Sequence, residues 1–250
     1  MSRELFSAVS GAQAAWSQLD VVSHNLANVS TNGYRARKMT FQLAQDANNR
    51  GVLGQAYTEP GESPLDLANG SLEKTDDPLN IAIQGKGFFE VQTADGRRLL
   101  TRSGDFQLDP QGMVVTSQGH QLMSSAGPVQ LLQGEQLIVR DNGVLAAQGA
   151  DGSVSDRGFL QIMDGEVTPL GTTLYEAKGE MTDVVQAGLT LEPGEAPPVQ
   201  LRQGHLERSN VDPLGAMVEL IEASRYFEAC QKLMKASDEA DQRLIRTGRT

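Results

Sequence analysis

The 250-residue sequence is poor in the residue types on which most redox and metal sites depend. It contains one cysteine, Cys230, which excludes an intrachain disulfide, a CxxC redox pair and a multi-cysteine zinc site. We interpret Cys230 as a small apolar packing residue. The three histidines, His24, His120 and His205, lie far apart without an i,i+4 partner, which disfavours a metal site. Aromatic residues make up only 5% of the chain, which predicts an aliphatic core.

Long hydrophobic runs and an excess of positive charge are also missing. No window approaches the ~20 apolar residues that a membrane-spanning helix needs, so we expect no membrane insertion. The segment from Met1 to Phe6 lacks the apolar stretch of a cleaved signal peptide. Lys and Arg number 21 against 32 Asp and Glu, and the net charge of −11 would repel nucleic acid and anionic membrane surfaces. Neither is an expected partner.

Common catalytic motifs are absent from the sequence. It has no GxxxxGK[ST] phosphate loop, no HExxH and no GxSxG. Gly85 and Gly87 resemble the opening of a dinucleotide-binding fingerprint, but Glu90 occupies the third glycine position and no helical pattern follows. We expect these glycines to relieve crowding between close strands. The sequence therefore predicts no enzyme activity, no cofactor and no small-molecule substrate.

Two short clusters of like charge remain as candidate sites. Arg35, Arg37 and Lys38 form the only compact basic cluster. We favour a helix-terminal turn for it, because cations are stabilised near the carboxyl end of a helix, and keep docking to a partner as the alternative. Asp76 and Asp77 could serve general acid–base catalysis, but in a chain with 32 acidic residues such neighbours are common. We interpret them as solvated.

Glycine and proline divide the chain into three zones. All ten prolines lie between Pro60 and Pro213, and 22 of the 26 glycines lie between Gly51 and Gly204. The ends are therefore expected to differ from the middle in secondary structure.

The first zone predicts a long amphipathic helix. Its apolar residues recur at steps of three and four: Leu5, Val9, Ala12, Trp16, Leu19, Val22 and Leu26. From residue 1 to 34 only Arg3, Glu4 and Asp20 are charged. The small number of charges could be due to chance, but we favour a helix that is enclosed by neighbouring subunits. Uncharged polar groups cost less to bury there than ions. Asn28 and the segment 30–33 should end it, with Gly33 in the left-handed conformation.

The last zone predicts a second helix, beginning at Pro213 and running to about Ile245. Asp212 can cap its first amides, and proline suits the first helical position. Its apolar stripe comprises Leu214, Met217, Leu220, Ile221, Phe227 and Met234. The i,i+4 pairs Glu228–Lys232 and Glu239–Arg243 indicate a solvated face. Because neither helix could bury its stripe alone, we expect the two to pair antiparallel as a coiled-coil stalk.

The middle zone predicts short β-strands separated by turns such as Asp95-Gly96 and Asn142-Gly143. The expected strands are Ile81–Val91, Leu99–Leu108, Met113–Val115, Leu137–Val139 and Val144–Ala146, with others near Phe159–Met163 and Val167–Leu174. This spacing favours a small antiparallel sandwich or barrel.

The predicted fold class is therefore α+β, with a terminal-helix stalk and a central, mostly antiparallel β domain. We assign residues 1–34 and 212–250 to the stalk and 78–190 to the β domain. Residues 35–77 and 191–211 are predicted to be extended connectors, since they are polar or proline-bearing and poorly periodic.

Four ordered segments resemble signatures of the flagellar rod and hook proteins. They are Asn25–Tyr34 (NLANVSTNGY), Pro78–Phe89 (PLNIAIQGKGFF), Thr101–Phe106 (TRSGDF) and Gly204–Asp212 (GHLERSNVD), the last followed by RYFE at 225–228. The chain thus resembles the flagellar basal-body rod protein family over nearly its whole length. Its compact connector is similar to that of the proximal-rod (FlgF) type, whereas the distal-rod (FlgG) type usually has a longer one and hook subunits are longer still.

The resemblance implies a structural subunit whose terminal helices form the inner tube of a helical assembly, with the β domain outside. It implies a basal-body location spanning the periplasm, and export through the flagellar type III apparatus without a cleaved signal peptide. The implied partners are copies of the chain, other rod subunits and the export apparatus.

Site residues are expected at two places in such an assembly. Those expected at the stalk interface between subunits are Leu5, Val9, Trp16, Leu19, Leu26, Met217, Ile221 and Phe227. Those expected to set the junction between stalk and β domain are Asn28, Gly33, Leu206, Ser209 and Asn210.

Three other functions are alternatives to the proximal rod. A distal-rod subunit is the alternative within the family. A secreted envelope-binding or adhesin module, using its end helices to oligomerise, comes from a different class, although the low aromatic content argues against carbohydrate binding. A hydrolase acting on cell wall has no recognisable catalytic site.

Overall fold

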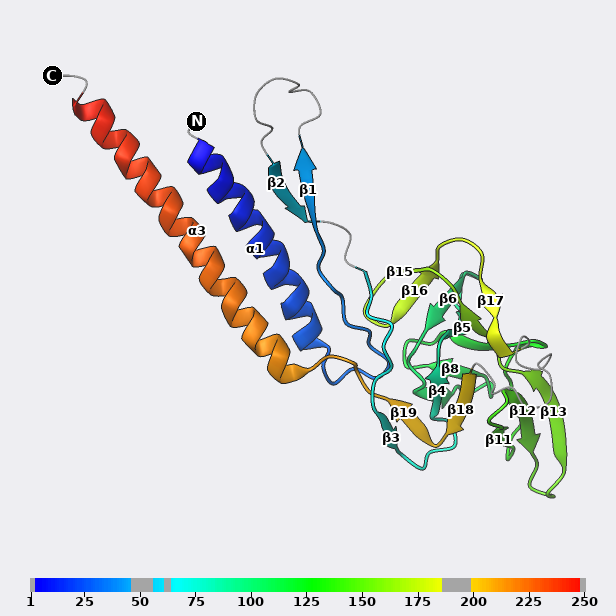
Figure 1. Ribbon diagram of the computed structural model, residues 1–250. Helices are drawn as coiled ribbons and strands as arrows, with labels where there is room; N and C mark the ends of the chain where they lie inside the picture. The colour runs from blue at the N-terminus through cyan, green and yellow to red at the C-terminus, as the bar shows by residue number, and fades with distance from the viewer. Residues whose placement is uncertain (1–2, 46–55, 61–63, 186–198, 248–250) are drawn as a thin grey trace, which may run out of the picture. The chain divides into compact units, whose positions relative to one another are not determined.

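The computed structural model describes residues 3–45, 56–60, 64–185 and 199–247 (Figure 1). The chain divides into two compact units. The helical unit comprises Met1–Val29, Ala36–Asp66 and Val211–Thr250, and the β unit comprises Ser30–Arg35 and Leu67–Asn210. The fold is α+β, with helices near both ends of the chain and an antiparallel β region between them, as predicted.

The first helix, α1, runs from Arg3 to Ala27. It ends where the Asn28 side chain donates a hydrogen bond to the His24 carbonyl, at 2.8 Å. The prediction is confirmed for Asn28 and for the left-handed conformation of Gly33, which has a φ of 68°, but Gly33 lies beyond the last helical residue and does not close the helix. An asparagine that satisfies a terminal carbonyl can end a helix before any glycine is reached.

The last helix, α3, runs from Pro213 to Thr247. Asp212 caps it as predicted, with Oδ1 accepting from the Leu214 amide at 3.1 Å and Oδ2 from the Gly215 amide at 3.2 Å. Proline lacks the amide hydrogen that would otherwise need a partner at this position. Neither described helix has the apolar composition over a sufficient length to cross a membrane.

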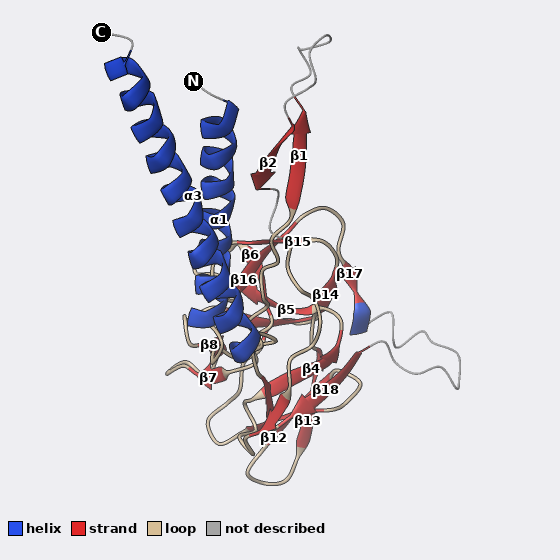
Figure 2. Ribbon diagram, turned by 60° about the vertical axis from the view of Figure 1, so that its left-hand side comes forward, coloured by secondary structure: helices blue, strands red, loops and turns tan. Residues whose placement is uncertain are grey.

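The two helices lie side by side and antiparallel (Figures 1 and 2). The side chains buried along them are small: Ala8, Ala12, Ala15 and Val22 on α1, and Ala216, Ala223 and Cys230 on α3. A Cβ atom on Gly11 would lie 3.3 Å from the Cys230 sulfur and 3.3 Å from the Tyr226 hydroxyl. Burial of Cys230 agrees with its predicted packing role.

The buried seam of α1 differs from the predicted stripe. Ala12 and Val22 were predicted and are buried, but Val9 and Trp16 are exposed, and the seam instead follows Ala8 and Ala15. Small side chains let two helix axes approach closely, so large neighbours on the flank of the seam stay outside. The periodicity therefore identified the helix but not which apolar residues face its partner.

The helical unit also contains two paired β-strands. Strands β1 (Phe41–Gln45) and β2 (Ala56–Pro60) are antiparallel, with Phe41 opposite Pro60. Nearby, the Lys38 ammonium pairs with the Asp66 carboxylate at 2.8 Å. The segment interpreted as an extended connector thus includes paired strands, because backbone pairing does not require the strong side-chain alternation that the sequence lacks.

The strands of the β unit are short. They are β3 (Leu72–Lys74), β4 (Ile81–Gly85), β5 (Phe88–Gln92), β6 (Arg98–Thr101), β7 (Phe106–Leu108), β8 (Val114–Thr116), β9 (Gln121–Ser124), β10 (Gly127–Pro128), β11 (Gln136–Val139), β12 (Val144–Gln148), β13 (Val154–Phe159), β14 (Ile162–Asp164), β15 (Val167–Pro169), β16 (Leu174–Ala177), β17 (Thr182–Asp183), β18 (Val199–Gln203) and β19 (His205–Glu207).

These strands form four antiparallel groups. The largest sheet has the order β15-β16-β6-β5-β9-β8-β7, with β10, β14 and β17 attached. Strands β11, β12 and β13 form a second sheet, and β18 pairs with β4 and β19 with β3. The last two pairs bring the C-terminal end of this unit beside its N-terminal strands, with Gln203 opposite Ile81 and His205 opposite Lys74.

Two of the predicted strands are each divided into two. The segment 81–91 breaks between β4 and β5, where Gly85 and Gly87 have φ values of 127° and 104°. A Cβ atom on Gly87 would also lie 2.7 Å from the Ile162 side chain, which confirms for Gly87 that glycine relieves close packing between strands. The segment 99–108 breaks between β6 and β7, around Arg102.

The core of the β unit is mainly aliphatic, as predicted. Its buried residues include Ile81, Ile83, Val91, Leu122, Leu145, Leu160, Ile162 and Leu201. Two aromatic pairs add to it: Phe89 packs edge to face on Phe106 with ring centroids 5.3 Å apart, and Phe88 contacts Tyr175 with ring centroids 5.0 Å apart. Burial of each large apolar side chain stabilises the unit by about 1.5–3 kcal/mol.

Candidate functional site

A cluster of buried charges joins distant segments of the β unit. Arg102 follows β6, Glu207 ends β19, and Arg35 belongs to the short segment 30–35. Arg102 Nε lies 2.5 Å from Glu207 Oε2, and Arg35 Nη2 lies 3.0 Å from Glu207 Oε1. The side chains of Arg35, Arg102 and Glu207 are only 3%, 1% and 1% exposed. Their charges therefore interact with little screening by water.

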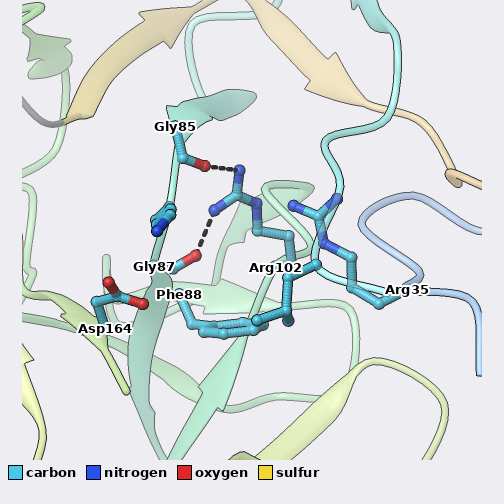
Figure 3. A pocket seen from close by; sticks show the side chains of 8 residues that line it. Arg35, Gly85, Gly87, Phe88, Arg102 and Asp164 are labelled. Atoms are coloured by element: carbon cyan, nitrogen blue, oxygen red, sulfur yellow. Dashed lines mark hydrogen bonds between the residues drawn. The ribbon is translucent and has the colours of Figure 1, made fainter. Parts of the chain in front are cut away.

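Arg102 is held by backbone carbonyls as well as by Glu207. Its guanidinium group donates to the carbonyl of Gly85, at 2.7 Å, and to that of Gly87 (Figure 3). It also donates to the Ile83 carbonyl, at 2.8 Å. Burial lowers the pKa of Arg102, the Glu207 charge partly offsets this, and Arg35 lowers the pKa further. The carbonyls at the end of β4 and in the break after it thus accept hydrogen bonds from Arg102, which lowers the free-energy cost of burying its charge.

Arg35 is less completely satisfied. It donates to the Ala68 carbonyl and, at 3.2 Å, to the Asn69 side chain. Its buried Nε has no hydrogen-bond acceptor among the residues that the structure describes. Two buried guanidinium groups consequently share one buried carboxylate.

A pocket of about 140 Å³ lies beside this cluster (Figure 3). It is lined by Arg35, Leu67, Gly85, Lys86, Gly87, Phe88, Arg102 and Asp164. Within the described ranges no group of His, Cys, Asp and Glu is placed to hold a metal ion. The cluster can bind an anion or fasten chain segments, but both oxygens of Glu207 are occupied, so this carboxylate is poorly placed to act as a base.

Four of the predicted junction residues lie in the β unit with this cluster. The Gly33 amide donates to the Glu207 carbonyl at 2.8 Å, and a Cβ there would lie 2.4 Å from the Arg102 carbonyl carbon. Leu206 is buried, Ser209 is half-buried, and the Asn210 side chain donates to the Ala68 carbonyl at 2.9 Å.

The fifth predicted junction residue, Asn28, lies in the helical unit after α1.

The basic cluster of Arg35, Arg37 and Lys38 is also divided between the units. Arg35 is buried in the β unit, whereas Arg37 and Lys38 lie in the helical unit. The Arg37 amide donates to the Asn25 side chain at 2.9 Å. The interpretation of a single helix-terminal turn is therefore wrong, because each part of the cluster has its own local partners.

The predicted stalk residues differ in exposure within the helical unit. Val9, Trp16, Met217 and Ile221 are exposed, at 46%, 63%, 49% and 53%, and Leu19, Leu26 and Phe227 are half-buried. Trp16 and Phe227 are in contact, with ring centroids 5.8 Å apart. The side chain of Leu5 lies outside the described part of the chain. Further exposed apolar residues on α3 are Leu214, Val218, Tyr226 and Leu233.

Sequence reasoning missed the Arg102–Glu207 pair. Both residues lie in segments that were singled out, TRSGDF and GHLERSNVD, but no spacing rule links positions so far apart.

The acidic pair, Asp76 and Asp77, behaves as expected. The Asp76 carboxylate and the Lys74 ammonium, 2.9 Å apart, are both largely exposed.

Comparisons with known families cover most of the chain. A model described as "Flagella basal body rod protein" matches residues 5–35, one described as "Flagellar hook protein FlgE/F/G D1 domain" matches residues 82–203, and one described as "Flagellar basal body rod FlgEFG protein C-terminal" matches residues 202–247. The last two overlap at the end of β18.

Full-length relatives carry the same description. The flagellar basal-body rod protein FlgG of Bacillus subtilis is 30% identical, with 98% of each chain covered. FlgF of Mesorhizobium japonicum is 30% identical, over 99% of this chain and 98% of the relative, and FlgF of Salmonella typhimurium is 28% identical, with 97% of each covered. The chain belongs to the flagellar basal-body rod protein family, whose members are structural proteins and not enzymes.

Proposed function

We propose that the chain is a subunit of the proximal rod, of the FlgF type, that polymerises through its terminal helices into a rigid shaft transmitting torque. The observation that carries this proposal is the set of large apolar side chains exposed on both helices. Trp16 on α1 and Met217 and Ile221 on α3 are each about half exposed or more. Apolar surface of this kind marks sites of association in soluble proteins.

The composition of α1 supports enclosure by other subunits. Its few charged residues, Arg3, Glu4 and Asp20, leave a polar face of uncharged side chains, which can be buried at much lower cost than ions. A contact between two different surfaces of the same chain does not close on itself and so generates a helical polymer. The exposed apolar residues would then be buried between copies.

The terminal helices are proposed to act as a coiled coil. Ala216, Ala223 and Cys230 are buried at intervals of seven residues, the repeat of a coiled-coil seam. In this proposal residues 1–34 and 212–250 line the inner tube, and residues 78–190 form the outer domain. Residues 35–77 and 191–211 connect them, and the exposed or half-buried stalk residues given above make the contacts between subunits.

The buried charge cluster supports a role in transmitting force. Gly33 and Arg35 precede the strands of the β unit and Glu207 ends the last of them, and a hydrogen bond and an ion pair join these residues. Removing Glu207 would leave two buried guanidinium groups without a counter-ion, which is strongly unfavourable. Such a cluster would keep these segments from yielding under load.

The proximal assignment is supported by alignment length. The alignment to FlgF of Mesorhizobium japonicum spans 252 positions and covers 99% of this chain, whereas that to FlgG of Bacillus subtilis needs 265 positions to cover 98%. The FlgG relative therefore has more residues opposite gaps in this chain. A distal-rod subunit is the alternative. It stays open because the chain is 30% identical to both the FlgG and the FlgF relative.

The proposed path to this location is export through the flagellar type III apparatus, without a cleaved signal peptide, to a site spanning the periplasm. Export and assembly require contact with the export apparatus, other rod subunits and further copies of the chain. Nucleic acid and small-molecule substrates are not among the proposed partners.

Electron microscopy of basal bodies from a clean deletion strain tests the proposal. Rings that lack a completed rod and hook, restored by the wild-type chain, are the expected result. Intact flagella in the deletion strain would contradict it. To separate the subtypes, the chain should be expressed in strains lacking either FlgF or FlgG, and we expect motility to return only in the strain lacking FlgF.

A further inference from the structure

The buried charges beside the pocket of the β unit do not sum to zero. Arg35 and Arg102 are both buried, and Glu207 is the one buried carboxylate that they share. Arginine does not lose its proton in proteins, so one positive charge stays in surroundings that hold little water. The lowered pKa of Arg102, to which Arg35 contributes, has the same origin.

Arg35, which lines the pocket, has an unused donor, and the other charged residues of the lining leave the excess of one cation unchanged. Arg35 Nε is buried without an acceptor in the described part of the chain. Lys86, which is exposed, and Asp164 also line the pocket. With them the site has Arg35, Arg102 and Lys86 against Glu207 and Asp164, so one cation remains in excess. Figure 3 shows the guanidinium group of Arg102 between Arg35 and the Gly85–Gly87 segment.

We propose that this pocket receives the carboxylate of an Asp or Glu side chain from a neighbouring copy of the chain. One carboxylate would balance the excess charge and supply the acceptor that Arg35 Nε lacks. Leu67, which is 53% exposed, and Phe88 would contact its methylene groups. The inference rests on the proposed polymer, because only there are copies held side by side.

The size of the pocket and the charge of the chain favour this occupant. A volume of about 140 Å³ is small beside the ~300–1,000 Å³ of typical small-molecule sites, but a single side chain can enter it. The chain has a net charge of −11, so the surface of a second copy presents carboxylates to a pocket of opposite charge.

A comparison of two variants tests the pocket in the monomer. Leu67→Glu places a carboxylate at the pocket from within, and Leu67→Gln has the same shape without the charge. We expect the thermal unfolding midpoint of Leu67→Glu to lie about 2–4 °C above that of Leu67→Gln. The difference should persist when Lys86 is changed to Gln, because a surface pair with Lys86 would contribute little. Equal midpoints, or a lower one for Leu67→Glu, would overturn the proposal.

Cross-linking between labelled copies tests the source of the carboxylate. Unlabelled and ¹⁵N-labelled chains are mixed, allowed to associate and treated with a carbodiimide, which joins an amine to a carboxylate in direct contact. We expect cross-links that join Lys86 of one copy to an Asp or Glu of a copy with the other isotope label. Their yield should be well above that of cross-links from the exposed Lys178, and they should disappear in the Leu67→Glu variant. Links from Lys86 to Asp164 of the same copy alone, in assemblies that sediment, would overturn the proposal.

The two failures are distinguishable. If sedimentation shows that the copies do not associate, the proposed polymer is contradicted. The Leu67 comparison in the monomer still decides whether the pocket holds a carboxylate.

Discussion

Arg102 and Glu207 form an ion pair in which Nε and Oε2 are 2.5 Å apart and each side chain is 1% exposed. They are separated by most of the β unit in sequence, yet they meet beside the backbone carbonyls of β4 and Gly87. Glu207 also receives the Arg35 guanidinium group and the Gly70 amide, at 3.0 Å and 2.9 Å. This carboxylate is the common partner of three segments.

Loss of Glu207 should therefore be far more damaging than loss of a surface carboxylate. Glu207→Ala leaves two buried guanidinium groups without a counter-ion, and we expect the free energy of unfolding to fall by about 3–5 kcal/mol. The control is Glu73→Ala, which removes the partner of Arg208 from a pair that is about half exposed. Its expected cost is at most about 1 kcal/mol in urea titrations. Equal losses in the two variants would mean that the buried pair has no special role.

A second prediction concerns Gly33. Gly33→Ala must hold a positive φ and place its Cβ 2.4 Å from the Arg102 carbonyl carbon, so the two segments would have to separate. Gly119→Ala has a similar φ of 83° but meets nothing within 4 Å. We expect about 1–2 kcal/mol of destabilisation for Gly119→Ala and clearly more for Gly33→Ala, measured by chemical unfolding. If Gly119→Ala costs as much, the close approach is not what requires glycine.

A third prediction concerns the start of α3. Asp212→Ala removes the acceptor of the Leu214 and Gly215 amides, and we expect it to destabilise the helical unit by about 1 kcal/mol. Asp212→Asn keeps an acceptor oxygen and should recover most of this loss. Helix content followed by circular dichroism during thermal unfolding distinguishes the variants. Identical unfolding of Asp212→Ala and the wild type would contradict the assigned cap.

A fourth prediction concerns pH. Burial, with a smaller effect of the Arg37 charge, lowers the pKa of His24 below its ordinary value of 6.5, and Asp20 opposes this. The unfolded chain then binds the proton more readily than the folded one, so stability falls as the pH drops below about 6.5. The His24→Gln variant should lose less stability than the wild type between pH 7.5 and pH 5. A steeper loss in the variant would show that the sign is wrong.

Local patterns predicted the helices well, because their signals lie within a few residues. The Asp212-Pro213 cap and the i, i+3, i+4 spacing both report local geometry, and both helices are where they indicated. The seam was harder to predict. A hydrophobicity pattern favours Val9 and Trp16, but close packing of two helices selects Ala8 and Ala15.

Long-range features could not be predicted in the same way. Gly87 was correctly linked to close strand packing, but the carbonyls of Gly85 and Gly87 also accept hydrogen bonds from Arg102, which no local pattern indicates. Buried charge is unusual for arginine and glutamate, and neither Arg102 nor Glu207 has a neighbour in sequence that signals it. The antiparallel pairings of β18 with β4 and of β19 with β3 place Glu207, whereas Arg102 is placed by the pairing of β6 with β5, so residues from distant parts of the chain are brought together.

The central claim is that the apolar side chains exposed on the terminal helices are buried between copies of the chain in the rod. Met217 and Ile221 lie one helical turn apart and are 49% and 53% exposed. The double variant Met217→Ser, Ile221→Ser should therefore leave the isolated chain folded, with an unchanged unfolding midpoint. Leu170→Ser, at a similarly exposed apolar residue in the β unit, is the control.

The most direct measurement is electron microscopy of basal bodies from cells that carry only the double variant. The account predicts rings without a completed rod and hook, whereas cells with Leu170→Ser build complete structures. Complete rods in the double variant would contradict the claim that this helix face assembles the rod.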